Sequence, residues 1–184
     1  MSTKETELKI SILGSGVLRQ KAKTVGKVND THRKVLSQMA QRMYDAGGIG
    51  LAAPQVGVSL SMIVVDIGSG LYKLINPKVV KRTGSQVNQE GCLSVPGICI
   101  KIKRARNVVI QALDENAAPI TIEAQDLLAC VLQHEIDHLR GKLIVDYASL
   151  IQKVRLSKKI TELKDKSKDE ELSESKTKLC QLQL

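Results

Sequence analysis

Short runs rich in β-branched residues, separated by turn-forming residues, occupy residues 61–122 and constrain the fold more than any other feature. The runs cover residues 62–67, 71–75, 78–81, 98–102, 108–113 and 120–122. Gly68-Ser69-Gly70, Asn76-Pro77 and similar turn residues separate them. Connections this short join antiparallel strands, because a parallel crossover needs about a dozen residues or more. We therefore expect antiparallel β-sheets.

Three segments outside these runs have a helical pattern. In residues 30–46, apolar side chains recur at helical spacing, with Asp30 as the expected N-cap. Residues 126–139 form a second such segment, which ends before Gly141. A third starts near Tyr147 and continues into a lysine-rich C-terminal region. The expected class is α+β, with an N-terminal and a C-terminal helix.

The length of 184 residues fits one domain. We expect a single folded domain in residues 1–168 and a polar, frayed tail in residues 169–184, which has little to bury. The absence of Trp and Phe removes the usual base-stacking platforms, so we expect no sequence-specific nucleic-acid binding. The polar start and the lack of any run of ~18 apolar residues predict a cytoplasmic protein without a membrane span.

His134-Glu135-Ile136-Asp137-His138 is an H-E-x-x-H sequence inside the second expected helix. Two histidines four residues apart lie on nearly the same helix face, so both imidazoles can reach one metal ion. Glu135 projects beside them, where a carboxylate can take a proton from a water molecule and later return it. The alternative is a solvated helix face that carries two histidines without a metal.

A catalytic metal site needs a third protein ligand and an open position for water. Cys92, within the sequence E-G-C-L-S at 90–94, is a candidate, because a thiolate is a soft anionic ligand and the preceding glycine permits a close backbone approach. Taken alone, a cysteine such as Cys92 is more often a small buried hydrophobic residue than a metal ligand.

Three motifs occur in order along the chain: G-I-G-L-A-A-P-Q at 48–55, E-G-C-L-S at 90–94 and Q-H-E-I-D-H-L at 133–139. Together they resemble the signature motifs of bacterial-type peptide deformylases, and the likeness in layout extends from about residue 10 to residue 163. The resemblance implies antiparallel β-sheets wrapped around a central helix that carries H-E-x-x-H. It also implies metal-dependent hydrolysis of the N-formyl group from the N-terminal methionine of newly synthesised proteins, which releases formate.

The resemblance assigns roles to individual residues. It implies that Cys92, His134 and His138 bind the metal and that Glu135 is the general base and acid. Gln55 and the Leu93 N–H would form the oxyanion hole. The residues expected to contact the substrate are Gly48, Ile49, Gly50, Gly91, Arg104 and Val131.

These substrate residues have different expected tasks. Backbone groups of Ile49, Gly50 and Gly91 would hold the peptide as an added strand, where glycine leaves room for main-chain pairing. Gly48 belongs to a close wall that excludes acyl groups larger than formyl. Val131, together with Cys130, is a candidate for the methionine side-chain pocket. Arg104 matches a basic position near the substrate groove, and turn glycines remain the alternative for the glycine positions.

The ligand set leaves the metal open, because affinity and availability both select the ion. The resemblance implies one Fe²⁺ ion, with Zn²⁺, Ni²⁺ or Co²⁺ able to replace it. A zincin-type endopeptidase is a competing hypothesis, but it normally takes a third ligand from a downstream His or Glu, and no His follows His138. A second competing hypothesis is a basic nucleic-acid or ribosome-binding module with a structural metal, although a structural zinc site normally has about four protein ligands.

The formal net charge of +9 is concentrated near the C-terminus. Residues 151–168 contain seven Lys or Arg side chains against Glu162 and Asp165, which gives this segment a charge of +5. Substrates of the expected enzyme are nascent chains, so the basic helix is a candidate for binding ribosomal RNA by phosphate neutralisation. An ordinary solubilising helix explains the same charges.

Overall fold

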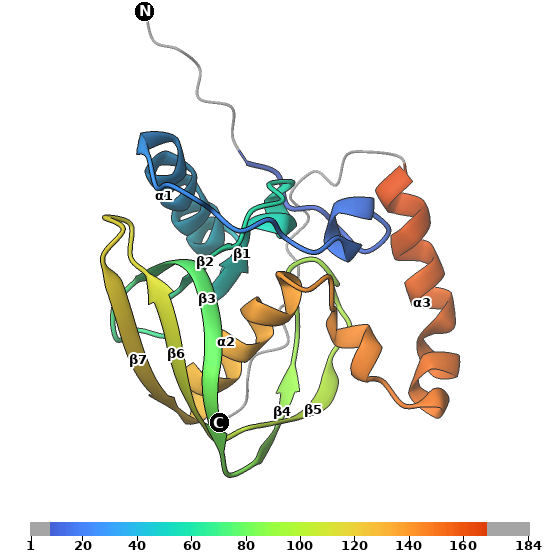
Figure 1. Ribbon diagram of the computed structural model, residues 1–184. Helices are drawn as coiled ribbons and strands as arrows, with labels where there is room; N and C mark the ends of the chain where they lie inside the picture. The colour runs from blue at the N-terminus through green and yellow to red at the C-terminus, as the bar shows by residue number, and fades with distance from the viewer. Residues whose placement is uncertain (1–7, 169–184) are drawn as a thin grey trace, which may run out of the picture.

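The computed structural model describes residues 8–168, which fold into two antiparallel sheets and three α-helices (Figure 1). The larger sheet has the strand order β1-β2-β3-β6-β7, and every neighbouring pair is antiparallel. Its strands are β1 (Gly50–Ala52), β2 (Met62–Val65), β3 (Tyr72–Thr83), β6 (Asn107–Leu113) and β7 (Pro119–Gln125). The smaller sheet pairs β4 (Gln86–Glu90) with β5 (Ile100–Arg104). The expected α+β class is confirmed.

The helix α2 (Asp126–His138) lies between the two sheets (Figure 1). Its apolar side chains, among them Ala129, Leu132 and Ile136, share one core cluster with the inner face of the larger sheet. Its polar side chains face β4 and β5, where they meet Glu90 and Arg104. The expected arrangement, with sheets wrapped around the helix that carries H-E-x-x-H, is therefore confirmed.

The other two helices cover the outside of the fold. The helix α1 (Asp30–Asp45) packs against β1 and β2 through a fully buried stripe that includes Leu36, Met39 and Met43. Its N-cap is Asn29, whose side chain accepts a hydrogen bond from the His32 N–H at 3.1 Å. The expectation that Asp30 caps this helix was wrong, because Asp30 already has a place in the first turn.

The helix α3 (Leu150–Lys168) follows the 3₁₀ helix η3 (Ile144–Tyr147). It packs through Leu156, Ile160 and Leu163 onto a cluster that also contains Cys92 and the β5 residues Ile100 and Ile102. Two further 3₁₀ helices are η1 (Gly16–Arg19) and η2 (Ala53–Val56). The predicted tail at 169–184 lies outside the described residues.

Three strands, β1, β3 and β4, differ from the sequence-based expectation. No strand was expected at β1 or at β4, and residues 71–75 and 78–81 were expected to be separate. The structure shows one strand, β3, that continues through Asn76-Pro77 with a shift of register against β6. Asn76 has a positive φ of 54°, so the turn signal in the sequence marks an irregularity inside a strand.

None of the helices within residues 8–168 combines the length and the apolar character that crossing a bilayer requires.

Candidate functional site

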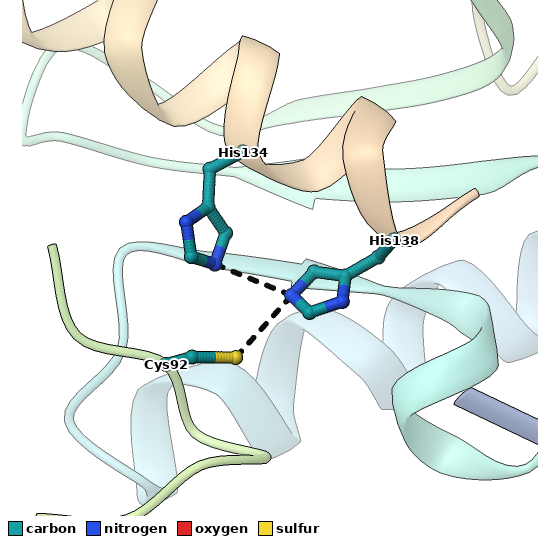
Figure 2. Close-up of side chains that lie close together, drawn as sticks. All are labelled: Cys92, His134 and His138. Carbon is teal, nitrogen blue, oxygen red and sulfur yellow. Dashed lines mark hydrogen bonds between the residues drawn. The ribbon is translucent and has the colours of Figure 1, made fainter. Parts of the chain in front are cut away.

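The ligand atoms of Cys92, His134 and His138 converge at one point, where they lie within 4.8 Å of one another (Figure 2). The spacing of four residues on α2 places both imidazoles on the same side of the helix. Cys92 comes from the loop after β4 and approaches from the opposite side. Its Sγ lies 3.3 Å from His138 Nε2, which lies 3.2 Å from His134 Nε2.

The donor set fits a divalent metal ion. In a tetrahedral site with metal–ligand bonds of about 2.1–2.3 Å, ligand atoms lie about 3.4–3.7 Å apart, and the distances from His138 Nε2 to the other two ligand atoms, 3.3 and 3.2 Å, are close to this. The acceptor lone pairs of two imidazoles and a thiolate repel one another unless a cation or protons lie between them. A set of two imidazole nitrogens and one sulfur is able to bind Fe²⁺, Co²⁺, Ni²⁺ or Zn²⁺.

Glu90 orients the His134 ring from the side opposite the cluster. A carboxylate oxygen of Glu90 lies 2.8 Å from His134 Nδ1, so that Nε2 points to the cluster. Arg104 donates to both oxygens of the same carboxylate, at 2.5 and 2.8 Å, and the pair is almost completely buried. Burial raises the pKa of Glu90, but the hydrogen bonds with His134 and Arg104 outweigh it and lower the pKa to about 2. Glu90 is therefore ionised and holds the imidazole as such carboxylates commonly do at metal sites.

Glu135 is buried beside the cluster, with only 3% of its surface exposed. Burial raises the pKa of its carboxyl group to about 7, against the opposing effect of the charges on His134 and Arg104. Its Oε2 has no hydrogen-bond partner among the described residues. A buried carboxylate with a pKa near neutrality and a free oxygen can both accept and donate a proton.

Gln55 also faces the cluster. The Ala52 N–H donates to Gln55 Oε1 at 2.7 Å, which fixes the orientation of the amide. The amide nitrogen then points to Ser94 Oγ at 3.2 Å and to Cys92 Sγ at 3.6 Å. This places an N–H donor beside the cluster, where negative charge can be stabilised.

The edge of the larger sheet borders this site. Within the described residues, β1 pairs with β2 alone, so its other edge is open. A Cβ atom added to Gly50 would overlap the Glu135 carboxyl group and lie 2.9 Å from Val131 Cγ1. A Cβ atom added to Gly48 would lie 2.9 Å from Leu93 Cδ1. Both glycines are therefore places where the backbone approaches the site closely.

The chain is similar in sequence to known proteins. The sequence profile of the family described as polypeptide deformylase matches residues 7–154. A peptide deformylase of Syntrophomonas wolfei subsp. wolfei is 52% identical over 132 residues, which cover 72% of this chain and 87% of the relative. The chain belongs to the polypeptide deformylase family.

Solved deformylase structures have the same fold. A crystal structure of a peptide deformylase from Legionella pneumophila matches with a TM-score of 0.82 and 38% identity, over 90% of this chain and all of that one (100%). A peptide deformylase from Synechococcus elongatus in complex with actinonin matches with a TM-score of 0.79 and 42% identity, over 85% of this chain and 90% of that one. Metal dependence is a property of deformylases, and the Cys92, His134 and His138 cluster is the candidate site for the ion.

The residues expected to contact the substrate do not all lie in the same kind of position. Ile49, Gly50 and Val131 lie together where β1 meets α2, since Ile49 and Val131 belong to the same core cluster. Gly91 is half-buried next to Cys92. Arg104 is only 7% exposed, and its guanidinium group binds Glu90 and Asp137. These contacts favour a role in orienting Glu90 over direct contact with the substrate.

Four polar residues of the site were not assigned a role from the sequence. Glu90 and Ser94 lie inside the E-G-C-L-S motif, and their position beside Cys92 in the sequence could have indicated that they belong to the site. Asp137, between the two histidines, binds Arg104 and Tyr147. Tyr147 gave no signal, because nothing local in the sequence indicates that it reaches the residues around the cluster.

Proposed function

We propose that this chain carries out the reaction of its family, removal of the formyl group from the N-terminal methionine of newly synthesised proteins, at the cluster of Cys92, His134 and His138. The observation that supports it most directly is the position of Glu135. Its buried carboxyl group, with a pKa of about 7, lies beside three convergent metal ligands. A general base and acid next to a Lewis-acid site is the arrangement that hydrolysis of an amide requires.

Cys92, His134 and His138 would hold one divalent ion. When bound, the ion lowers the pKa of a water molecule toward neutrality and polarises the formyl carbonyl group. We propose Fe²⁺ as the physiological ion, with Zn²⁺, Ni²⁺ or Co²⁺ able to occupy the same ligands. The mixed nitrogen and sulfur donor set accepts all four ions, so supply in the cell contributes to the choice.

Glu135 would move the proton in both halves of the reaction. Its carboxylate takes a proton from the attacking water, whose oxygen forms a bond to the formyl carbon. The same carboxyl group then gives that proton to the amine nitrogen of methionine as the carbon–nitrogen bond breaks. Formate and a free N-terminus are the products, and water is the only co-reactant.

Gln55 and Leu93 would stabilise the charge that develops on the formyl oxygen. The Gln55 amide is oriented in advance by the Ala52 N–H and by Ser94, so its N–H does not have to reorient during the reaction. The backbone N–H of Leu93 follows the ligand Cys92 directly in the chain. A pre-arranged donor of this kind contributes about 3 kcal/mol to transition-state stabilisation.

The peptide would bind as an additional strand along the open edge of β1. Main-chain groups of Ile49 and Gly50 on one side and Gly91 on the other would pair with it. Gly48 approaches the Leu93 side chain closely, and a wall formed there would accept the hydrogen of a formyl group and exclude a methyl group by crowding. Val131 lies beside Gly50, where it would contact the methionine side chain.

A direct assay tests this function. Protein purified without oxygen is loaded with Fe²⁺ or Co²⁺ and given formyl-Met-Ala-Ser, with acetyl-Met-Ala-Ser and an unformylated peptide as controls. We expect release of formate from the first peptide alone and no cleavage of internal peptide bonds. Cleavage of internal bonds, or equal turnover of the acetylated peptide, would contradict the proposal.

The basic helix α3 supports a finer proposal about location. Six of its basic side chains are exposed: Lys153, Arg155, Lys158, Lys159, Lys164 and Lys166. We propose that they hold the enzyme near ribosomal RNA, where nascent chains emerge, and that the enzyme is cytoplasmic. The exposed positive charge on α3 supports the proposed attraction to RNA.

A further inference from the structure

Tyr147 is linked to the metal-ligand cluster through a chain of polar contacts. It belongs to η3 and is 39% exposed, yet its hydroxyl donates a 2.7 Å hydrogen bond to Asp137 Oδ2. The same oxygen accepts a 2.8 Å hydrogen bond from Arg104 Nη1. The Tyr147 ring also lies 5.4 Å from the centre of the Arg104 guanidinium group, within the range of a cation–π contact.

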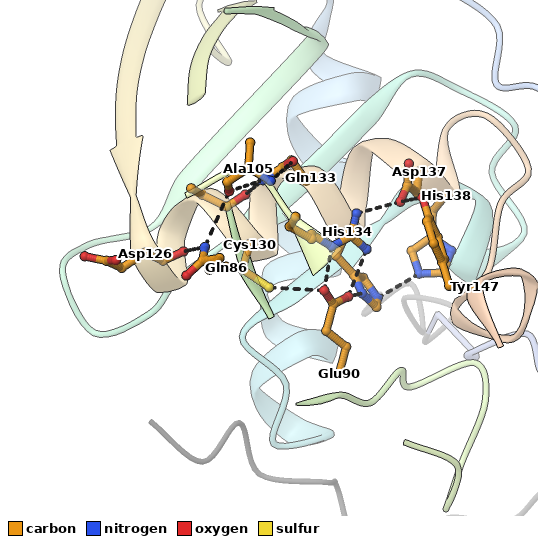
Figure 3. A network of polar contacts seen from close by, with 12 residues as sticks. Gln86, Glu90, Ala105, Asp126, Cys130, Gln133, His134, Asp137, His138 and Tyr147 are labelled. Atoms are coloured by element: carbon orange, nitrogen blue, oxygen red, sulfur yellow. Dashed lines mark hydrogen bonds and ion pairs between the residues drawn. The ribbon is translucent and has the colours of Figure 1, made fainter. Parts of the chain in front are cut away.

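The other nitrogens of Arg104 carry the chain of contacts inward. They bind both oxygens of Glu90, and one of these oxygens lies 2.8 Å from the metal ligand His134 (Figure 3). A guanidinium group is planar and rigid, so its orientation at one end determines its position at the other. Glu90 fixes one end of that plane, and Asp137 and Tyr147 fix the other.

The segment that carries Tyr147 is itself well anchored. Asp146 accepts a hydrogen bond from the Leu143 N–H at 2.8 Å and forms an ion pair of 2.6 Å with Arg19. Ile144 and Val145 are buried in the cluster that also contains Cys92. Tyr147 is therefore a fixed point, and its hydroxyl and ring provide a rigid support for the outer end of Arg104.

We propose that Tyr147 is a positioning residue for the metal site, which acts through Asp137, Arg104 and Glu90 on the orientation of His134. The proposal rests on the proposed function, because it assumes that His134 is a metal ligand. Removal of the Tyr147 hydroxyl frees the Asp137 carboxylate to rotate, and Arg104 then loses one of its two carboxylate partners. His134 becomes less well oriented, so the ion dissociates faster.

Tyr147→Phe is the variant to test, because it keeps the ring and its contact with Arg104 and removes the hydroxyl alone. Tyr44→Phe is the matched control, since the Tyr44 hydroxyl donates an equally short 2.7 Å bond to an aspartate, Asp66, from a residue that is 47% exposed. Tyr44 lies on α1, which the chain of contacts does not include. Tyr147→Leu removes the ring as well.

Both readouts use the Co²⁺-loaded protein and need no turnover. They are the visible absorption spectrum and the rate at which Co²⁺ passes to an excess of chelator. Partners behind a metal ligand typically contribute about 10- to 100-fold in affinity. We expect a smaller effect from this more distant residue, with about 3- to 10-fold faster loss of Co²⁺ in Tyr147→Phe. Tyr147→Leu should lose Co²⁺ faster still, and Tyr44→Phe at the wild-type rate.

The outcomes separate this proposal from the proposed function. A shifted Co²⁺ spectrum and faster loss in Tyr147→Phe, with Tyr44→Phe unchanged, support the positioning role. Unchanged spectrum and rate in Tyr147→Phe overturn it, even if the melting temperature falls, since that result describes a structural contact only. Failure of the wild-type protein to bind Co²⁺ overturns the metal site itself, and with it both proposals.

Discussion

The carboxyl group of Glu135 lies directly against the backbone of Gly50, so that even a single added methyl group would overlap it. This contact joins the edge of the larger sheet to the H-E-x-x-H helix. It brings the strand that is expected to hold the peptide within reach of the group that is expected to move the proton. The identity of residue 50 therefore affects both binding and chemistry.

Gly50→Ala should reduce kcat/KM for a formyl-Met peptide by at least about 100-fold, because misplacement of reacting groups by ~1 Å has a cost of that size. The φ of Gly50 is not in the left-handed region, so the effect comes from crowding and not from backbone strain. Gly26→Ala is the control, since nothing lies within 4 Å of a Cβ atom there. A Gly50→Ala enzyme with normal kcat/KM would show that the strand does not meet Glu135 as described.

Glu135→Gln should keep the fold and the bound metal but lose about 10²- to 10⁴-fold in kcat, because an amide cannot accept the proton of water. The change is nearly isosteric, so a loss of packing does not explain the effect. Metal content and the melting temperature, measured on the same preparation, check that the site is intact. Substantial residual formate release would remove Glu135 from the mechanism.

Cys92→Ser should weaken metal retention, because a hydroxyl group is a poor ligand where a thiolate is expected. His134→Ala and His138→Ala should have a stronger effect, since they leave no ligand atom at all. Cys130→Ser provides a comparison at a second buried free thiol, which is not one of the three convergent ligands and where a serine hydroxyl can still donate to Glu90 as the Cys130 thiol does. Metal content after dialysis against a chelator distinguishes them, and full occupancy in Cys92→Ser would place the third ligand elsewhere.

Glu90 should make the folded protein sensitive to acid. Its pKa is about 2 in the folded state against a usual value of 4.5. Its contribution to stability is therefore complete above pH 4.5 and decreases as the pH falls toward 2, because only the unfolded chain takes up the proton. At pH 3 the loss is about 2 kcal/mol. Urea unfolding of metal-free wild type and Glu90→Gln at pH 6 and pH 3 measures it, and an equal loss in both proteins would contradict the assignment.

The sequence predicts those parts of the site that depend on local geometry. His134 and His138 converge because a spacing of four residues on a helix places them there whatever surrounds the helix. The convergence of Cys92 with them depends on how the β4–β5 sheet packs against α2. No local pattern contains that information, and the family motifs supplied it. Arg104 illustrates the limit, because its charge alone could not show that it is buried between Glu90 and Asp137.

The strand β4 was missed for a related reason. Its alternate residues Gln86, Asn88 and Glu90 are polar and face the interior, where Gln86 and Glu90 meet polar partners on α2. The usual alternation of apolar and polar residues is therefore absent, and the strand cannot be recognised by its period. Strand β1 has only three residues, all buried, which is too short for any period to be seen.

The final prediction concerns the basic helix α3. Deletion of everything after Lys153 would not be a clean test of ribosome binding, because it removes Leu156, Ile160 and Leu163, which pack in the same cluster as Cys92. Substitution of exposed charges leaves that packing intact. A five-site variant changes Lys153, Arg155, Lys158, Lys164 and Lys166 to Gln. Lys159 is kept, because its ammonium group donates to the Gly97 carbonyl oxygen.

If α3 binds ribosomal RNA, this variant should cleave a short formyl-Met peptide at the wild-type rate but co-sediment less with ribosomes at low salt. The control removes the same charge from exposed lysines elsewhere, at Lys21, Lys23, Lys27, Lys78 and Lys81. Each lost phosphate contact should reduce the slope of log affinity against log salt concentration by about 0.7–0.9. A reduction in the α3 variant alone identifies a surface that binds RNA. Equal reductions in both variants mean that net charge is responsible, and α3 is then an ordinary solubilising helix.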